Sequence, residues 1–146
     1  MAMLMNAVMV AVMLQGQVVV QGGPPPAPVP KNAPATLPDT PQAKAVKAYI
    51  EAFNTGDEAK FLKAQEELMT ADLLARRPAA DRAKMFKRMR GDFDSLKIKR
   101  AVSTPQQIRA VMADKDGNEA IFSFDFDPKA PTRIKGLGID IGNVER

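Results

Sequence analysis

The sequence contains no cysteine, no histidine and no tryptophan, and it has a single tyrosine. Without cysteine there are no disulfides, thiolate nucleophiles or zinc fingers, and without histidine there is neither a Ser-His-Asp triad nor a histidine general base. A carboxylate-only metal site or acid–base pair stays open as an alternative. We predict no metal, no cofactor and no catalytic residue, and we favour a binding protein over an enzyme.

Charge is scarce in the first part of the chain. Residues 1–43 carry only Lys31 and Asp39 as charged side chains, but they hold eight of the twelve prolines and five of the nine methionines. The remaining residues contain 20 Lys and Arg against 16 Asp and Glu, and therefore carry the whole net charge of +4. This contrast divides the chain into an apolar signal-like segment (1–21), a proline-rich linker (22–41) and one domain (42–146).

The apolar run Ala7–Leu14 has the length of a signal-peptide core and is shorter than the roughly 20 residues of a membrane span. No Lys or Arg precedes it. We expect export to the periplasm or out of the cell, with a disordered apolar tail as the alternative. The prolines from Pro24 to Pro30 lack a backbone donor and fix φ, so they predict an extended, solvated linker.

The period of the apolar residues then predicts helices. Thr40 and Pro41 are a typical helix start, and an apolar face with a period of 3.6 follows. That face consists of Val46, Tyr49, Ile50 and Phe53. A second helix begins after Asp57, a short turn is expected at Leu73–Leu74, and a third helix covers residues 79–90 with Gly91 as its stop.

After Gly91 the period changes to two, which predicts strands. The expected strands are built on Leu96, Ile98 and Val102, on Ile108–Ala113, on Ala120–Phe126 and on residues 133–141, with a turn at 114–118. Helices followed by strands indicate an α+β fold. We predict about three N-terminal helices packed on a curved, cone-like, four-stranded antiparallel sheet.

Four pieces of the sequence resemble a known family. Residues 48–57 read AYIEAFNTGD, which is similar to the opening helix and turn of nuclear-transport-factor-2-like domains. The others are Leu74–Pro78 with Arg82, then Phe126–Pro131, then Ile134–Ile139. Together they resemble the small cystatin-like α+β domain appended to exported bacterial beta-lactamase-like serine hydrolases and tail-specific-type peptidases. The resemblance implies an accessory domain and transfers no catalytic residue, because these residues contain no Ser-x-x-Lys motif.

Residues 76–100 hold ten Lys and Arg against three Asp and Glu. A surface of like charge attracts an acidic protein or another anionic surface, whereas a merely solvated face is the alternative. Nucleic acid is a third and unfavoured partner, because no exposed aromatics interleave with these cations. We define the basic surface as Arg76, Arg77, Lys84, Lys87 and Arg88.

The cone interior is the second candidate site. Its expected lining residues are Tyr49, Phe53, Phe122, Phe124 and Phe126. They suit either a small apolar ligand or, in the alternative function, an isomerase- or dehydratase-like enzyme or a carrier. Tyr49 with Asp72 or Asp125 is the one pair available for acid–base chemistry, and core packing of Tyr49 is the favoured interpretation. The partner stays unknown, and a homodimer remains open.

Overall fold

In the computed structural model, which describes residues 18–20 and 28–141, the helices precede the main strands as the sequence predicts. The helices are α2 (Pro41–Asn54), α3 (Glu58–Leu68), α4 (Ala71–Arg76) and α5 (Ala79–Phe93). The strands are β1 (Val18–Val20), β2 (Lys97–Ser103), β3 (Gln107–Ala113), β4 (Glu119–Asp127) and β5 (Ala130–Asp140). The apolar run Ala7–Leu14 and the prolines Pro24–Pro26 lie outside the described residues.

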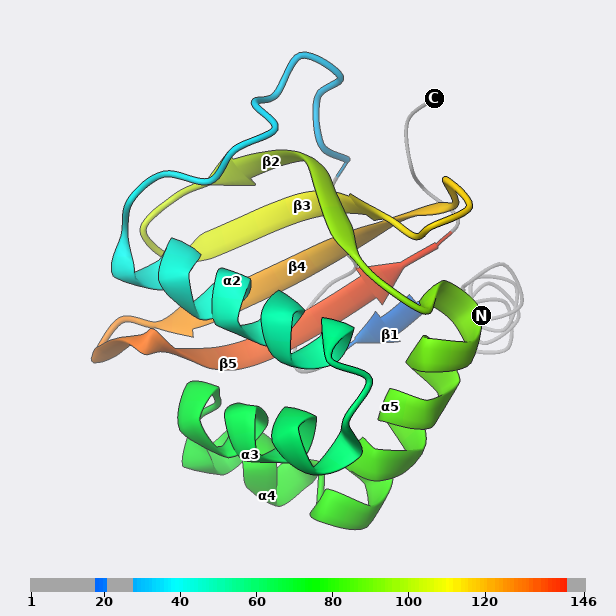
Figure 1. The fold of residues 1–146 in the computed structure, drawn as a ribbon. Coiled ribbons are helices and arrows are strands. Elements are labelled where there is room, and N and C mark those ends of the chain that lie inside the picture. The colour runs from blue at the N-terminus through cyan, green and yellow to red at the C-terminus, as the bar shows by residue number, and fades with distance from the viewer. Residues whose placement is uncertain (1–17, 21–27, 142–146) are drawn as a thin grey trace, which may run out of the picture.

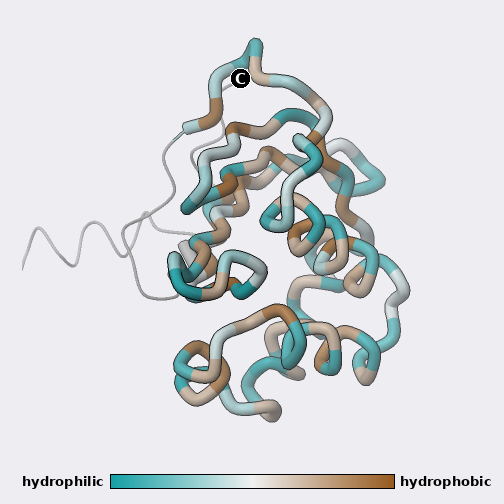
Figure 2. Tube along the Cα trace, turned by 90° about the vertical axis from the view of Figure 1, so that its left-hand side faces the viewer, coloured by the Kyte–Doolittle hydropathy of each residue, from teal (hydrophilic) through white to brown (hydrophobic). Residues whose placement is uncertain are grey.

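Strands β2 to β5 form the predicted antiparallel meander, and the α+β class is confirmed. A fifth strand, β1, adds to the free side of β5, where Val18 pairs with Asp140. Figure 1 shows α2 lying across the face of the sheet, with α3, α4 and α5 gathered beside it. Hydrophobic positions recur along the strands and along the helices between these two layers (Figure 2).

Two local predictions about the helices were wrong. The turn expected at Leu73–Leu74 is the short helix α4, because the hydroxyl of Thr70 accepts a hydrogen bond from the Leu73 amide and caps it. The third predicted helix, α5, does not stop at Gly91 but continues to Phe93, which is buried. Gly91 keeps helical backbone, and the chain leaves the helix at Asp94, which has a φ of 61°.

The second face of the sheet is covered by residues that we expected to be solvated. Val29 is fully buried against Val111 and Ile121, which project from β3 and β4 away from the helices. The carbonyl of Pro34 accepts a hydrogen bond of 2.8 Å from the Ala101 amide on β2. The prediction of a solvated linker is therefore wrong at Val29, because apolar residues on the outer face of the sheet need cover, whereas most of residues 28–38 are exposed as predicted.

Replacing Val29 by Asp should destabilise the protein, since a carboxylate would be buried without a partner. We expect a loss of at least about 2 kcal/mol in the free energy of unfolding. Ala35 lies in the same segment but is exposed, so Ala35→Asp is the matched control and should change stability by less than about 0.5 kcal/mol. Urea unfolding of both variants measures the difference. Equal stability of the two variants would mean that this segment does not pack on the sheet in solution.

Candidate functional site

The aromatic residues expected to line the cone are brought together, and they pack against one another. Tyr49 contacts Phe61 and Phe124 edge-on, with ring centroids 5.2 and 5.4 Å apart. Phe53 contacts Phe61 and Phe86 in the same way, at 5.7 and 5.8 Å. All of these rings are buried, as are those of Phe122 and Phe126. Edge-to-face contacts at these distances are favourable, and here they join α2 to α3, α5 and β4.

The hydroxyl of Tyr49 lies inside this cluster, with no hydrogen-bond partner among the described residues. Burial raises the pKa of Tyr49 well above its ordinary value, because the phenolate would be stranded in an apolar environment. A phenol held neutral in this way is a poor general acid or base near neutral pH. Neither Asp72 nor Asp125 accepts a hydrogen bond from it, so the pair nominated from the sequence is not formed.

Asp72 and Asp125 instead line a polar cleft beside the β4–β5 turn, together with Arg76 and Lys135. The guanidinium of Arg76 donates to the backbone carbonyls of Asp72 and Lys135, both at 3.4 Å. Asp125 accepts a hydrogen bond of 2.8 Å from the Gln107 side chain. These contacts join α4 to the end of the sheet. Among the described residues, no group of three or more Asp or Glu is placed to hold a metal ion.

The predicted basic surface lies on α4, on the loop that follows it and on α5. Lys84, Lys87 and Arg88 occupy the exposed side of α5, opposite the buried Phe86 and Met89. Lys87 is 3.8 Å from Glu58, and Arg88 is 3.9 Å from Asp92. Ion pairs this long and this exposed contribute little free energy, so these cations stay available to another anion.

Arg82, on α5, is a candidate that the sequence reasoning did not single out as a site. It is only 7% exposed, and its Nε donates to the Arg77 carbonyl at 2.9 Å. Its Nη1 lies 3.4 Å from the Leu62 carbonyl and 3.4 Å from Oε1 of Gln65. All three acceptors are neutral, and no carboxylate of the described residues forms an ion pair with Arg82. Its spacing from Phe86 and Met89 places it on their apolar stripe. A charged residue on such a stripe is the feature of the sequence that could have identified Arg82.

Arg82 borders a cleft enclosed by the helices and by β5. The other lining residues are Gln65, Met69, Leu73, Arg77, Asp81, Met85, Leu137 and Ile139. The centre of a water-sized molecule can occupy about 20 Å³ of this cleft. That space is large enough for one water molecule. A larger ligand would have to displace side chains.

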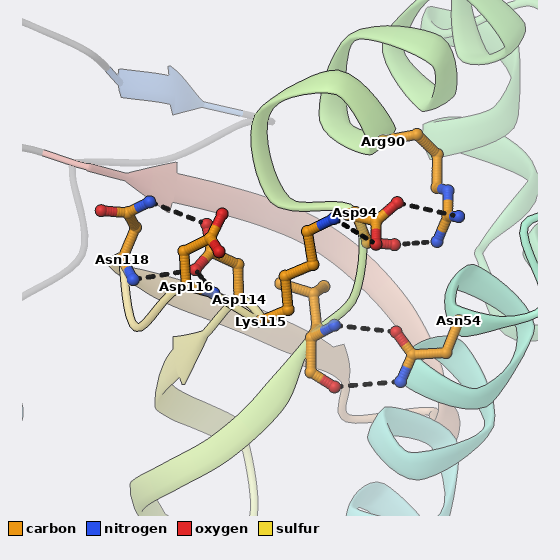
Figure 3. A network of polar contacts seen from close by, with 8 residues as sticks. Asn54, Arg90, Asp94, Asp114, Lys115, Asp116 and Asn118 are labelled. Carbon is orange, nitrogen blue, oxygen red and sulfur yellow. Dashed lines mark hydrogen bonds and ion pairs between the residues drawn. The ribbon is translucent and has the colours of Figure 1, made fainter.

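A separate network of polar contacts joins α2 and α5 to the sheet (Figure 3). The side chain of Asn54 donates to the Leu96 carbonyl at 2.9 Å and accepts from the Leu96 amide at 2.8 Å. Asp94 is paired with Arg90 at 3.4 Å and with Lys115 at 3.6 Å. These contacts connect the ends of both helices to the start of β2 and to the β3–β4 turn, which indicates a structural role.

The backbone of Asp94 is strained. Its φ of 61° and ψ of −53° place it at the centre of a tight turn, in which the Ser95 amide donates to the Phe93 carbonyl at 2.6 Å. Turns of this hand are rare because a side chain crowds the backbone. The network in Figure 3 holds the residue in this conformation.

Glycine should therefore be better than alanine at position 94. We expect Asp94→Gly to be more stable than Asp94→Ala by about 1 kcal/mol, because both lose the ion pairs but only glycine accepts a positive φ without strain.

Gly91 is the opposite case, since a Cβ there would meet nothing within 4 Å and the residue is helical. Gly91→Ala should stabilise the protein by about 0.5–1 kcal/mol. Thermal unfolding of the three variants tests both signs, and a higher stability of Asp94→Ala would contradict the strain.

Comparison of the chain with protein-family models, with curated proteins and with solved structures found no match. The arrangement itself shows helices packed on an antiparallel sheet, whose four strands β2 to β5 form a meander. This arrangement is compatible with a nuclear-transport-factor-2-like fold. No helix within the described part of the chain is long and apolar enough to cross a membrane.

Proposed function

We propose that this protein is a non-catalytic accessory domain of the nuclear-transport-factor-2-like or cystatin-like kind, which docks an acidic protein through the basic surface. The observation that carries the proposal is the row of cations on the exposed side of α5, Lys84, Lys87 and Arg88. Like charges one helical turn apart repel by a few tenths of a kcal/mol per pair. An acidic partner would offset this repulsion.

The packing of the interior supports binding rather than catalysis. The aromatic rings expected to line an open cone are buried against one another, and burial keeps the one tyrosine neutral. The surface supports a protein partner rather than a membrane. Ile141 is the one large hydrophobic residue of the described part with an exposed side chain, at 38%, so the basic surface offers no apolar group for insertion into lipid.

Export is a second part of the proposal and depends on the apolar run Ala7–Leu14. Fractionation of cells that express the full chain, followed by sequencing of the N-terminus, tests it. We expect the protein in the periplasm or in the medium, starting at a residue after Leu14. Protein in the cytoplasm with an intact N-terminus would contradict export without touching the docking proposal.

The docking surface is tested with a triple variant, Lys84→Gln, Lys87→Gln and Arg88→Gln. Poly-L-glutamate serves as the acidic polypeptide. Because each exposed ion pair contributes about 0.2–1 kcal/mol, we expect the variant to bind roughly tenfold more weakly than the parent. Added salt should reduce the binding of the parent toward that of the variant. Fluorescence anisotropy of labelled polyglutamate measures both effects, and the folding stability should change little.

A matched control removes the same charge elsewhere, with Lys97→Gln, Lys99→Gln and Lys129→Gln, all exposed and outside the basic surface. We expect this control to bind like the parent. Equal weakening by both triple variants would mean that net charge alone attracts the polyanion. Preferential binding of the parent to phosphatidylglycerol vesicles or to duplex DNA would replace the protein partner by a membrane or by nucleic acid.

A further inference from the structure

We propose that the cleft between α3, α4, α5 and β5 binds a small ligand with an apolar body and a carboxylate, and that Arg82 pairs with this carboxylate. The inference rests on Arg82 and not on the three α5 cations that carry the docking proposal, because Arg82 lies on the buried side of α5 and Lys84, Lys87 and Arg88 lie on its exposed side. Arg77 of the basic surface also lines the cleft. It concerns a different class of ligand, a small molecule in place of an acidic protein.

Arg82 is a buried cation that forms no ion pair with a described residue. Arginine side chains are rarely buried without an ion pair, because removal of a cation from water is costly. The hydrogen bonds of Arg82 go to two carbonyls and one amide oxygen, through Nε and Nη1. They leave Nη2 without a partner among the described residues. In this proposal Nη2 is the donor that meets a ligand in the cleft, which Arg82 lines.

The walls of the cleft are largely apolar. Apart from its polar residues, the lining consists of Met69, Leu73, Met85, Leu137 and Ile139. Two of these five are methionines, whose flexible side chains adapt to the shape of a ligand. Since the cleft has room for about one water molecule, a short alkyl chain would enter by moving Met69 and Met85 rather than by filling a ready-made cavity.

The cleft is lined by charged as well as apolar side chains. Arg77 and Arg82 line it together with a single acid, Asp81. An apolar cleft with a buried guanidinium that forms no ion pair with a described residue complements an apolar anion. With Nε and Nη1 engaged, a carboxylate would accept from Nη2, and this charge-assisted hydrogen bond favours an anionic ligand over an uncharged one.

Hexanoate is a suitable probe because it combines a carboxylate with a short alkyl chain, and 1-hexanol is its uncharged control. We expect the full-length protein to bind hexanoate at least about tenfold more tightly than 1-hexanol, since a hydrogen bond to a charged group contributes about 1.5–3 kcal/mol. In NMR titrations the Nε–Hε signal of Arg82 and the methyl signals of Leu137 and Ile139 should shift together. These shifts would place both ends of the ligand.

A charge-removing variant separates ligand binding from the structural contacts of Arg82. Arg82→Gln should weaken hexanoate binding at least about tenfold and leave 1-hexanol binding unchanged. Lys63→Gln removes an exposed cation from α3 outside the cleft and should bind both ligands like the parent. If Arg82→Gln does not fold, the comparison of hexanoate with 1-hexanol on the parent protein decides the matter.

Three results would overturn the proposal. One is equal affinity of the parent for hexanoate and 1-hexanol, because the guanidinium would then contribute nothing. Another is the absence of shifts at Arg82, Leu137 and Ile139 up to the solubility limit of hexanoate. The third is equal weakening of hexanoate binding by Arg82→Gln and Lys63→Gln. A purely structural role of Arg82 predicts the first two.

Discussion

The contacts of Tyr49 with Phe61 and Phe124 join two consecutive helices to a strand that is distant in the sequence, and the rest of the structure depends on them. Through these rings α2 is fixed both to α3 and to the sheet. The cleft beside Arg82 lies between the helices and β5.

Much of this fold could be predicted from the sequence, because most elements bury one face and expose the other. The apolar period of 3.6 in α2 and α5 follows directly from that asymmetry. In β4 the alternation of Phe122, Phe124 and Phe126 with Ser123 and Asp125 marks the face that packs on the helices, although most of the other face is buried as well. Helix α4 was missed because six residues are too few to show a period. The burial of Val29 was missed for a different reason. Its partners Val111 and Ile121 are distant in the sequence, and composition alone describes a proline-rich segment as solvated.

The candidate sites were predictable to unequal degrees. The exposed cations of α5 could be read from the sequence, because their spacing is set by the helix and by the apolar residues between them. Arg82 could also be recognised in the sequence, because it is in phase with Phe86 and Met89 and is therefore a charged residue on a stripe that should be apolar. What the sequence could not show is that its acceptors are the carbonyls of Arg77 and Leu62. Those contacts depend on how α3 and the α4–α5 loop meet, and that is a property of the folded chain.

The position of β1 has a consequence for the order of folding. Its residues are made well before their partners on β5, since Val18 pairs with Asp140. Pro34 likewise waits for Ala101 on β2, at the opposite edge of the sheet. Both segments therefore stay undocked until their partner strands have been made, and unpaired strand edges are where chains aggregate. A growing chain of this protein spends its most vulnerable period with the segments that will close its own edges already made but not yet docked.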